Sequence, residues 1–180
     1  MPGFTHRLAA EQDLPALRRL MARAIEQLQA EFLDPAQVAA SHEVMGLDTQ
    51  LIADRTYFIV ELDRRMAGCG GWSRRATLFG GDHSAPMRDP RLLDSLTEPA
   101  RVRAMYTDPD FARQGVGRYI LDLCEATVRR EGFSRVELMA TMSGVPLYRA
   151  CGYLPAAPED AKIDGVVVPL MRMTKTIGEH

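Results

Sequence analysis

The sequence predicts an α/β domain in which helices surround one mixed sheet. The chain has 180 residues, of which 46% are hydrophobic, so it is long enough for one substantial core and short for two domains. Segments with the two-residue period of strands are interspersed with segments that have the period of helices. No internal repeat or low-complexity tract interrupts this order. We therefore expect residues 1–180 to form a single domain.

The composition argues against several classes of protein. A net charge of −2 argues against a general nucleic-acid binder, which would carry a marked basic excess on at least one face. The odd number and wide spacing of Cys69, Cys124 and Cys151 fit neither a disulfide framework nor a zinc cluster. We expect no metal site and a reducing, cytoplasmic setting. The sequence shows neither a leader peptide nor an apolar run near the roughly 18 residues of a membrane helix, so we expect no membrane segment.

The first third of the chain predicts a strand, a long helix and then shorter helices. An extended segment covers residues 4–8, and Asp13 precedes a helix with one apolar face. Residues 37–52 are less regular and predict one or two short helices. Within them, His42 and Glu43 are noted, although an ordinary surface position is the better interpretation. The apolar stripe of the long helix is Leu14, Leu17, Leu20, Met21, Ala24, Ile25 and Leu28.

Residues 56–73 predict an antiparallel hairpin. The run 56–62 alternates as a strand, residues 63–65 form a turn, and the run 66–73 is a second strand weakened by glycine. No helix follows Gly68, Gly70 and Gly71, so close backbone packing or a bulge explains them better than a nucleotide motif.

Residues 74–99 form a long, turn-rich insertion. Loops of more than about 15 residues in a compact domain are often functional or disordered. His83, Asp82, Arg88 and Asp94 are therefore candidate substrate contacts. A solvated loop without a role in binding is an interpretation at least as good.

The stretch 105–118 organises the rest of the chain. Residues 101–106 alternate as a strand, Pro109 ends it, and helical spacing begins near Arg118 after Gly115 and Gly117. The backbone N–H groups of residues 114–118 would be the unpaired donors of a first helical turn, and such donors attract anions. A strand at 135–140 follows, and a last strand at 166–174 contains Pro169, which argues for an edge, a bulge or a break.

The block 101–153 resembles the GNAT superfamily of acyl-CoA-dependent N-acetyltransferases. The resemblance rests on the Gly115 and Gly117 loop, followed by Leu147-Tyr148 and Gly152-Tyr153. It implies a single GNAT-like domain with a mixed, mostly antiparallel sheet flanked by helices. It also implies acetyl-CoA as co-substrate, an amine acceptor whose pocket is usually shaped by the region 37–52, and the possibility of a homodimer.

The same resemblance assigns residues to the cofactor. It implies that the backbone of Tyr106 and Thr107 holds the pantetheine arm and the thioester carbonyl. Where the family often has an asparagine, this chain has Thr141, and Thr141 or Ser143 would supply a comparable hydrogen bond. The family usually begins its phosphate loop with Arg or Gln, whereas Ala112 stands there in this chain. The loop residues expected at the diphosphate are Ala112, Arg113, Gln114, Gly115, Val116, Gly117 and Arg118.

The catalytic groups are also candidates from the resemblance and from the chemistry of acyl transfer. Tyr148 is the candidate general acid, since a phenol with a pKa of about 10 stays protonated at neutral pH. Its alternative role is that of a half-buried core aromatic. Glu98 and Glu137 are the candidate bases for removing a proton from the amine, and structural or surface carboxylates are the alternative for both.

The leading hypothesis is therefore an N-acetyltransferase that moves an acetyl group directly from acetyl-CoA to an amine of a small molecule or protein. A non-catalytic acyl-CoA-binding sensor or regulatory module is the alternative. A weaker third possibility is an unrelated phosphate-ligand site at the Gly-x-Gly loop. The acceptor is not predicted by the sequence.

Overall fold

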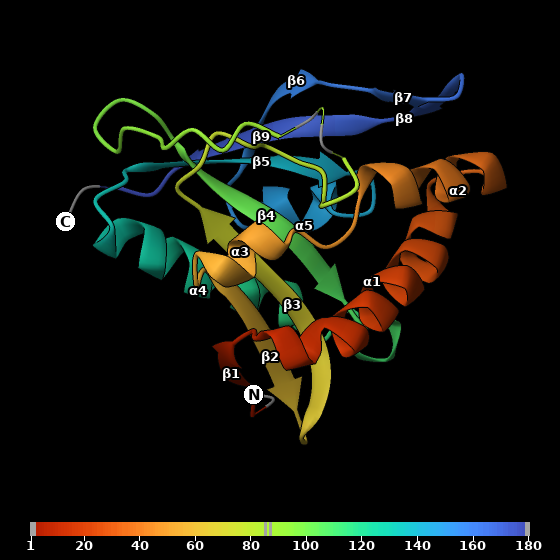
Figure 1. The fold of residues 1–180 in the computed structure, drawn as a ribbon, viewed down its shortest axis with the longest axis horizontal. Helices are drawn as coiled ribbons and strands as arrows, with labels where there is room; N and C mark the ends of the chain where they lie inside the picture. Colours follow the sequence, from red (N-terminus) through yellow and green to blue (C-terminus); the bar gives the residue numbers. More distant parts are fainter. Residues whose placement is uncertain (1–2, 85, 87, 179–180) are drawn as a thin grey trace.

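A computed structural model describes residues 3–84, 86 and 88–178 (Figure 1). Its main sheet has seven strands, and every neighbouring pair is antiparallel except the parallel pair β4 and β5. The predicted α/β domain with a mixed, mostly antiparallel sheet is confirmed. The order of strands in the sheet is β1 (Thr5–Leu8), β2 (Tyr57–Leu62), β3 (Arg65–Ser73), β4 (Ala100–Thr107), β5 (Arg135–Thr141), β9 (Leu170–Thr176) and β6 (Leu154–Pro158).

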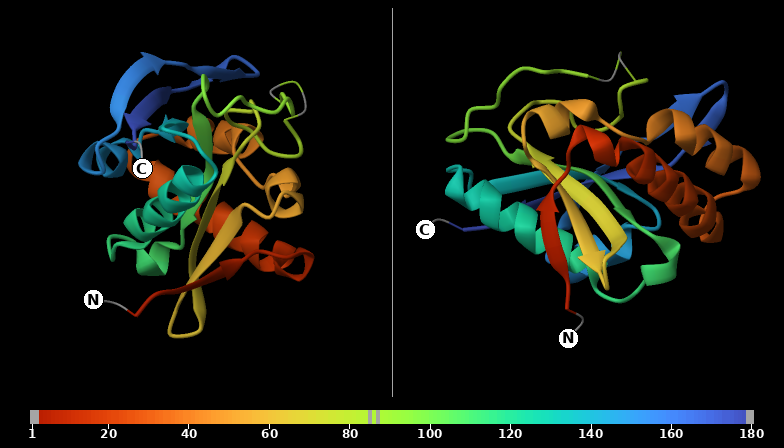
Figure 2. Two further views of the ribbon diagram at one scale, coloured as in Figure 1. Left: turned by 90° about the vertical axis from the view of Figure 1, so that its left-hand side faces the viewer. Right: turned by 60° about the horizontal axis from the view of Figure 1, so that its bottom comes forward.

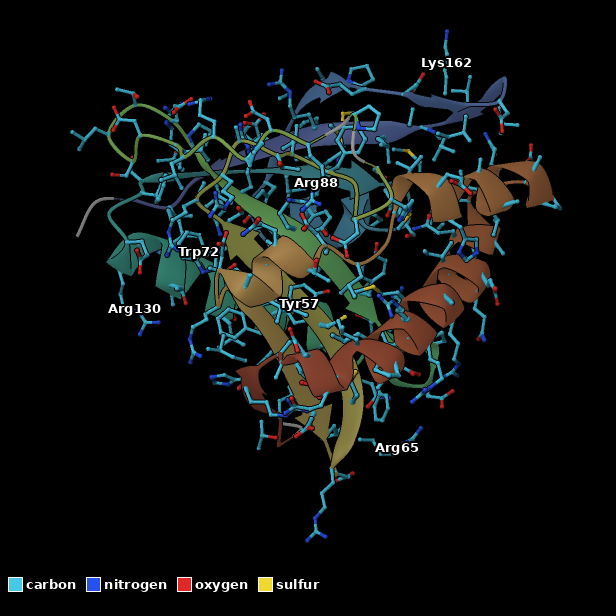
Figure 3. All side chains as sticks on the ribbon, in the orientation of Figure 1. Tyr57, Arg65, Trp72, Arg88, Arg130 and Lys162 are labelled. Atoms are coloured by element: carbon cyan, nitrogen blue, oxygen red, sulfur yellow. The ribbon has the colours of Figure 1, made fainter. Side chains whose placement is uncertain are left out.

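Helices cover both faces of this sheet (Figure 2). On one face α1 packs with Tyr57 and Ile59 of β2 in one apolar cluster, and Tyr57 is seen between α1 and α3 (Figure 3). On the other face Ile120 of α4 and Tyr148 of α5 pack against Trp72 and the neighbouring strands. Two apolar layers therefore hold the sheet between them. The helices are α1 (Leu14–Leu28), α2 (Pro35–Val44), α3 (Thr49–Ala53), α4 (Val116–Arg130) and α5 (Val145–Ala150).

The glycines of β3 bring α4 close to the sheet. A Cβ at Gly68 would lie 2.5 Å from Cγ1 of Val116, and one at Gly70 would lie 2.7 Å from Cγ2 of Ile120. Both distances are too short for carbon atoms, so these positions accept only glycine while α4 stays where it is. The close packing predicted from the sequence is confirmed, and it places the start of α4 directly over β3.

The C-terminal part of the chain differs from the expectation in two respects. Pro169 separates a short strand, β8 (Val166–Val168), from β9, which confirms the break. The sequence did not indicate β7 (Ala161–Ile163), which pairs with β8, or the edge strand β6. Strand β6 contains Pro155 and Pro158, and such strands are tolerated at a sheet edge because one side needs no donor.

Ion pairs tie the insertion 74–99 to the body of the protein. Arg75 donates two hydrogen bonds to Asp54, at 2.7 and 3.0 Å. Asp48 is buried and accepts from Arg103 of β4 at 3.0 Å and from Arg88 of the insertion at 2.5 Å. A buried carboxylate with two guanidinium partners holds the insertion against β4, and a freely solvated loop is the wrong description of this segment.

Candidate active site

Strands β4 and β5 diverge soon after they begin. They pair only at Ala100 with Val136 and at Arg101 with Glu137. Beyond these pairs β5 is bonded along its length to β9 and β4 to β3, so the two strands separate towards their C-terminal ends (Figure 1). We call the space between them the splay cleft. Met105, Tyr106, Thr141 and Tyr148 line both its inner part and its mouth.

The end of β4 offers a backbone N–H group to the splay cleft. The N–H of Asp108 donates to the carbonyl of Ala67 on β3 at 2.9 Å. Because successive N–H groups of a regular strand point to opposite sides, the N–H of Thr107 faces away from β3, towards the side that β5 has left. The N–H of Tyr106 faces β3 instead. This direction fits the predicted contact at Thr107, and the predicted backbone contact at Tyr106, which also lines the cleft, stays a prediction.

A bulge in β4 interrupts the regular alternation of its backbone N–H groups. Ala104 has a φ of 51°, and the pairing with β3 shifts between Cys69 and Gly71. The hydroxyl of Tyr57 donates to the carbonyl of Ala104 at 2.7 Å and fixes the bulge from the α1 face. Bulges of this kind re-aim the groups beside them, and no feature of the sequence marks this one.

The start of α4 offers free backbone donors. Gly115 precedes the helix with a φ of 93°, and no side chain caps the helix there. The first bond of the helix runs from the N–H of Tyr119 to the carbonyl of Gly115, at 3.0 Å. The N–H groups of Val116, Gly117 and Arg118 therefore have no partner within the helix, as expected for a first turn. The sequence predicted these donors among residues 114–118.

The remaining loop residues lie just before this turn. Ala112 ends a short 3-10 turn, and its N–H donates to the carbonyl of Pro109 at 3.3 Å. Gln114 donates through Nε2 to the carbonyl of Asp110, at 3.3 Å. Arg113, Gln114 and Arg118 are exposed, so their side chains are available to an anion at the helix.

Gly117 has a packing role besides any contact with a ligand. A Cβ at this position would lie 2.5 Å from Cδ2 of Leu147 in α5. The absence of a side chain therefore lets α5 approach the first turn of α4. The mouth of the splay cleft consequently contains Gly117, Leu147 and Tyr148 together.

Tyr148 lines the splay cleft as the motif predicted. Its ring packs edge-on against Tyr153 with centroids 5.9 Å apart, and a Cβ on Gly144 would lie 2.8 Å from Cε2 of Tyr148. The Tyr148 hydroxyl lies 3.8 Å from Sδ of Met105, a weak acceptor. Burial raises the pKa of Tyr148 above its usual value, so the phenol stays protonated across the neutral range.

Thr141 and Ser143 lie together at the end of β5. Their hydroxyl oxygens are 3.1 Å apart, and both residues line the mouth of the splay cleft. Each hydroxyl has donor and acceptor capacity beyond this single contact. The structure thus brings them to the position where the sequence expected a substitute for an asparagine side chain.

The two candidate bases do not reach the splay cleft. Glu98 precedes β4 at the end opposite Thr107, and Arg91 binds both of its oxygens at 2.9 and 3.0 Å. These hydrogen bonds lower the pKa of Glu98 to about 2. Glu137 lies in the paired part of β5 and forms ion pairs with Arg101 at 2.5 Å and Arg172 at 2.9 Å. The register of the strands, which the sequence did not reveal, places both carboxylates away from Tyr148.

Residues at the C-terminal end of α1 form a further wall of the splay cleft, which the sequence does not indicate. Ala24, Ile25, Leu28 and Gln29 line the mouth of the splay cleft opposite Thr141 and Ser143. Only a long-range contact brings this helix there, because α1 packs across the end of β4. The inner part of the cleft is closed by apolar residues of α2, the insertion and the C-terminal strands. These are Val44, Met45, Leu78, Phe79, Met139 and Leu170.

The candidate contacts of the insertion separate into two groups. His83 and Asp82 border a second hollow that also contains His42 and meets the splay cleft at Met45 and Gly46. Arg88 pairs with Asp48 and Asp82, Asp82 also accepts from Thr49, and Asp94 accepts from residues of its own turn. Glu43 contributes its carbonyl, which accepts from Ser84 at 3.0 Å.

Two further findings concern the described residues as a set. No three side chains of His, Cys, Asp or Glu within residues 3–84, 86 and 88–178 are grouped so as to hold a metal ion. Across the same ranges, no helix combines the length and the apolar character that a membrane crossing requires. The three cysteines are free, and burial raises the pKa of Cys69 to about 12.

Residues 21–153 match the model of the acetyltransferase (GNAT) family. No curated protein matches the chain. Solved structures of similar fold include a GCN5-related N-acetyltransferase from Rhodopseudomonas palustris, with a TM-score of 0.70, 18% identity and coverage of 98% of this chain and 96% of that chain.

Two other solved structures of similar fold contain acetyl-CoA or coenzyme A. YncA from Salmonella typhimurium with acetyl-CoA has a TM-score of 0.62 and 16% identity, and the match covers 98% of this chain and 95% of that one. The PaiA N-acetyltransferase from Thermoplasma acidophilum with coenzyme A has a TM-score of 0.62 and 11% identity, over 97% and 99% of the two chains. At these identities the likeness concerns the fold.

Proposed function

The chain belongs to the GNAT acetyltransferase family, and from this premise we propose that it moves an acetyl group directly from acetyl-CoA to an amine of a small molecule or a protein. One observation carries the proposal. Gly117 in the first turn of α4, Met105 and Thr107 at the end of β4, and Tyr148 of α5 all line the mouth of the splay cleft. An acyl transferase needs these three kinds of group together.

The residues present fit acetyl-CoA, which supplies an acyl group activated as a thioester. The uncapped first turn of α4 suits a diphosphate, and Gly115 adds no Cβ in front of it. The exposed Arg113 and Arg118 add positive charge beside these donors. The backbone of Met105 and Thr107 suits an extended arm with amide groups, because an unpaired strand edge can accept such an arm.

Tyr148 is the group that we assign to holding a proton for the departing thiol. Its raised pKa keeps the proton on Oη, and its contact with the Met105 sulfur is too weak to withhold the hydroxyl from a stronger acceptor. We assign the N–H of Thr107 as the donor for an acyl oxygen that gains negative charge.

We assign the removal of the amine's proton to water. Glu98 and Glu137 are bound to arginines away from the cleft, and no carboxylate lines the inner part of the cleft among the described residues. Water can enter from the hollow bordered by His42, Asp82 and His83, which meets the cleft at Gly46.

The proposal is tested by measuring release of CoA thiol from acetyl-CoA with a panel of amines. The panel contains arylalkylamines, amino acids, polyamines, aminoglycosides and peptides. Amine-dependent release would support the transferase. CoA binding without release for any class would favour the sensor or regulatory module, and a melting temperature unchanged by CoA would favour an unrelated phosphate ligand.

A further inference from the structure

Gln29 is a buried polar side chain without a hydrogen-bond partner for its Oε1. It follows the last residue of α1 and opens a 3-10 turn, and its backbone carbonyl accepts from Phe32 and Leu33, each at 2.9 Å. The side chain is 4% exposed. Among the described residues, no donor reaches its Oε1.

Such a side chain is costly unless something satisfies it. Most buried polar atoms of native proteins are hydrogen-bonded, and a carboxamide oxygen that has lost water without gaining a donor destabilises the fold. An apolar side chain of similar length would fill the same space next to Leu28 without this cost. The carboxamide therefore calls for an explanation outside the packing of the protein itself.

The position of Gln29 in the splay cleft supplies this explanation. It lines the mouth of the splay cleft together with Thr107, Gly117, Ser143 and Tyr148. These four residues come from β4, α4, the end of β5 and α5, so α1 forms the remaining wall. Each of the four belongs to the set assigned above to acetyl-CoA, whereas the hollow that contains His42 and His83 does not include Gln29.

We propose that Gln29 is a cofactor-binding residue whose carboxamide oxygen accepts a hydrogen bond from an amide N–H of the pantetheine arm of acetyl-CoA. This inference rests on the proposed function. The arm carries two amides, and their N–H groups are the kind of donor that Oε1 lacks. The diphosphate oxygens are acceptors and suit the N–H groups of α4 instead. The turn at the end of α1 thus contributes a contact to the splay cleft in addition to those of β4, α4, the end of β5 and α5.

The experiment compares Gln29→Met with a matched control, Gln27→Met, at an exposed position in the last turn of α1. Calorimetry measures the binding of CoA and of adenosine 3′,5′-bisphosphate, which lacks the pantetheine arm. We expect Gln29→Met to weaken CoA about three- to tenfold, the range of one neutral hydrogen bond, and to leave the bisphosphate unchanged. The melting temperature of the free protein should stay the same or rise, because an unsatisfied buried group has been removed.

The opposite results would overturn the inference. They are unchanged CoA affinity in Gln29→Met, an equal loss for the bisphosphate, or a loss that Gln27→Met reproduces. If Gln29→Met does not fold, Gln29→Leu repeats the comparison with a shorter apolar side chain, and failure of both variants to fold would mean that the side chain serves packing and would overturn the inference. Failure of the wild-type protein to bind CoA would instead contradict the proposed function, so the two failures are distinguishable.

Discussion

The residues that follow Tyr148 hold its side chain in the cleft. Gly152 has a φ of 89°, which favours glycine, and it reverses the chain after α5. The reversal lets the N–H of Tyr153 donate to the carbonyl of Tyr148 at 2.9 Å, and the two rings then pack edge-on. The spacing of Leu147-Tyr148 and Gly152-Tyr153 therefore has a physical reason, since it fixes the rotation of α5.

Replacing Tyr148 by Phe tests its assigned role. We expect kcat to fall about 100-fold or more, because a positioned general acid contributes at least that much, while the affinity for acetyl-CoA changes little. Steady-state kinetics and calorimetry measure the two quantities. Wild-type turnover in the variant would show that another group or water protonates the thiolate.

The raised pKa of Tyr148 also predicts a pH dependence. A raised pKa means that the phenol keeps its proton at pH values where an exposed tyrosine loses it. The rate of acetyl transfer should therefore not decline through loss of this acid up to about pH 10. A decline in kcat near pH 8 that disappears in Tyr148→Phe would contradict this environment.

At the scale of elements, the start of α4 is predicted to bind the anionic part of acetyl-CoA. Arg118→Glu and Arg113→Glu place negative charge beside the free donors and should each weaken CoA about tenfold at low salt. Arg130→Glu makes the same change at the far end of α4, where the side chain projects outward (Figure 3), and should leave affinity unchanged. Equal effects of all three would mean that net charge alone, and not this turn, is responsible.

The packing of α4 on β3 is a second property of elements. Gly70→Val would place carbon atoms against Ile120 and Met105, and we expect the free energy of unfolding to fall by about 1 to 3 kcal/mol. Gly3→Val is the control, because a Cβ there meets nothing within 4 Å. Urea denaturation measures both. Equal stability of the two variants would contradict the close approach.

At the scale of the whole molecule, ionisable groups with shifted pKa values predict the pH range of stability. Hydrogen bonds from arginines lower the pKa of Asp13, Asp54 and Asp110, so their contribution is present above their unfolded pKa values and is lost as pH falls. Burial raises the pKa of Tyr57 and Cys69, so their contribution is lost as pH rises. Unfolding in urea should show a plateau between about pH 5 and pH 9. A maximum outside this range would contradict the ionic contacts described.

Local signals account for what the sequence could predict. The apolar stripe of α1, the alternation in β2 and the Gly115 turn are properties of neighbouring residues, and the structure has them as predicted. The resemblance to the GNAT family also predicted that Thr141 and Tyr148 contact one cofactor, and both residues line one cleft.

What the sequence could not predict depends on contacts between distant segments. The bulge at Ala104 decides which N–H groups of β4 face the cleft, and it has no signature of its own. The register of β4 and β5 decides that Glu137 meets Arg101. Gln29 enters the cleft only because α1 crosses the end of β4. Each of these positions follows from tertiary packing.

The most direct test of the central claim is detection of an acetylated amine by mass spectrometry after incubation with acetyl-CoA. Wild-type protein should form such a product with at least one class of the amine panel, together with an equal amount of CoA thiol. Tyr148→Phe should form it much more slowly while still binding CoA. If the wild-type protein binds CoA and yet acetylates no amine of any class, the result contradicts the proposed acetyl transfer.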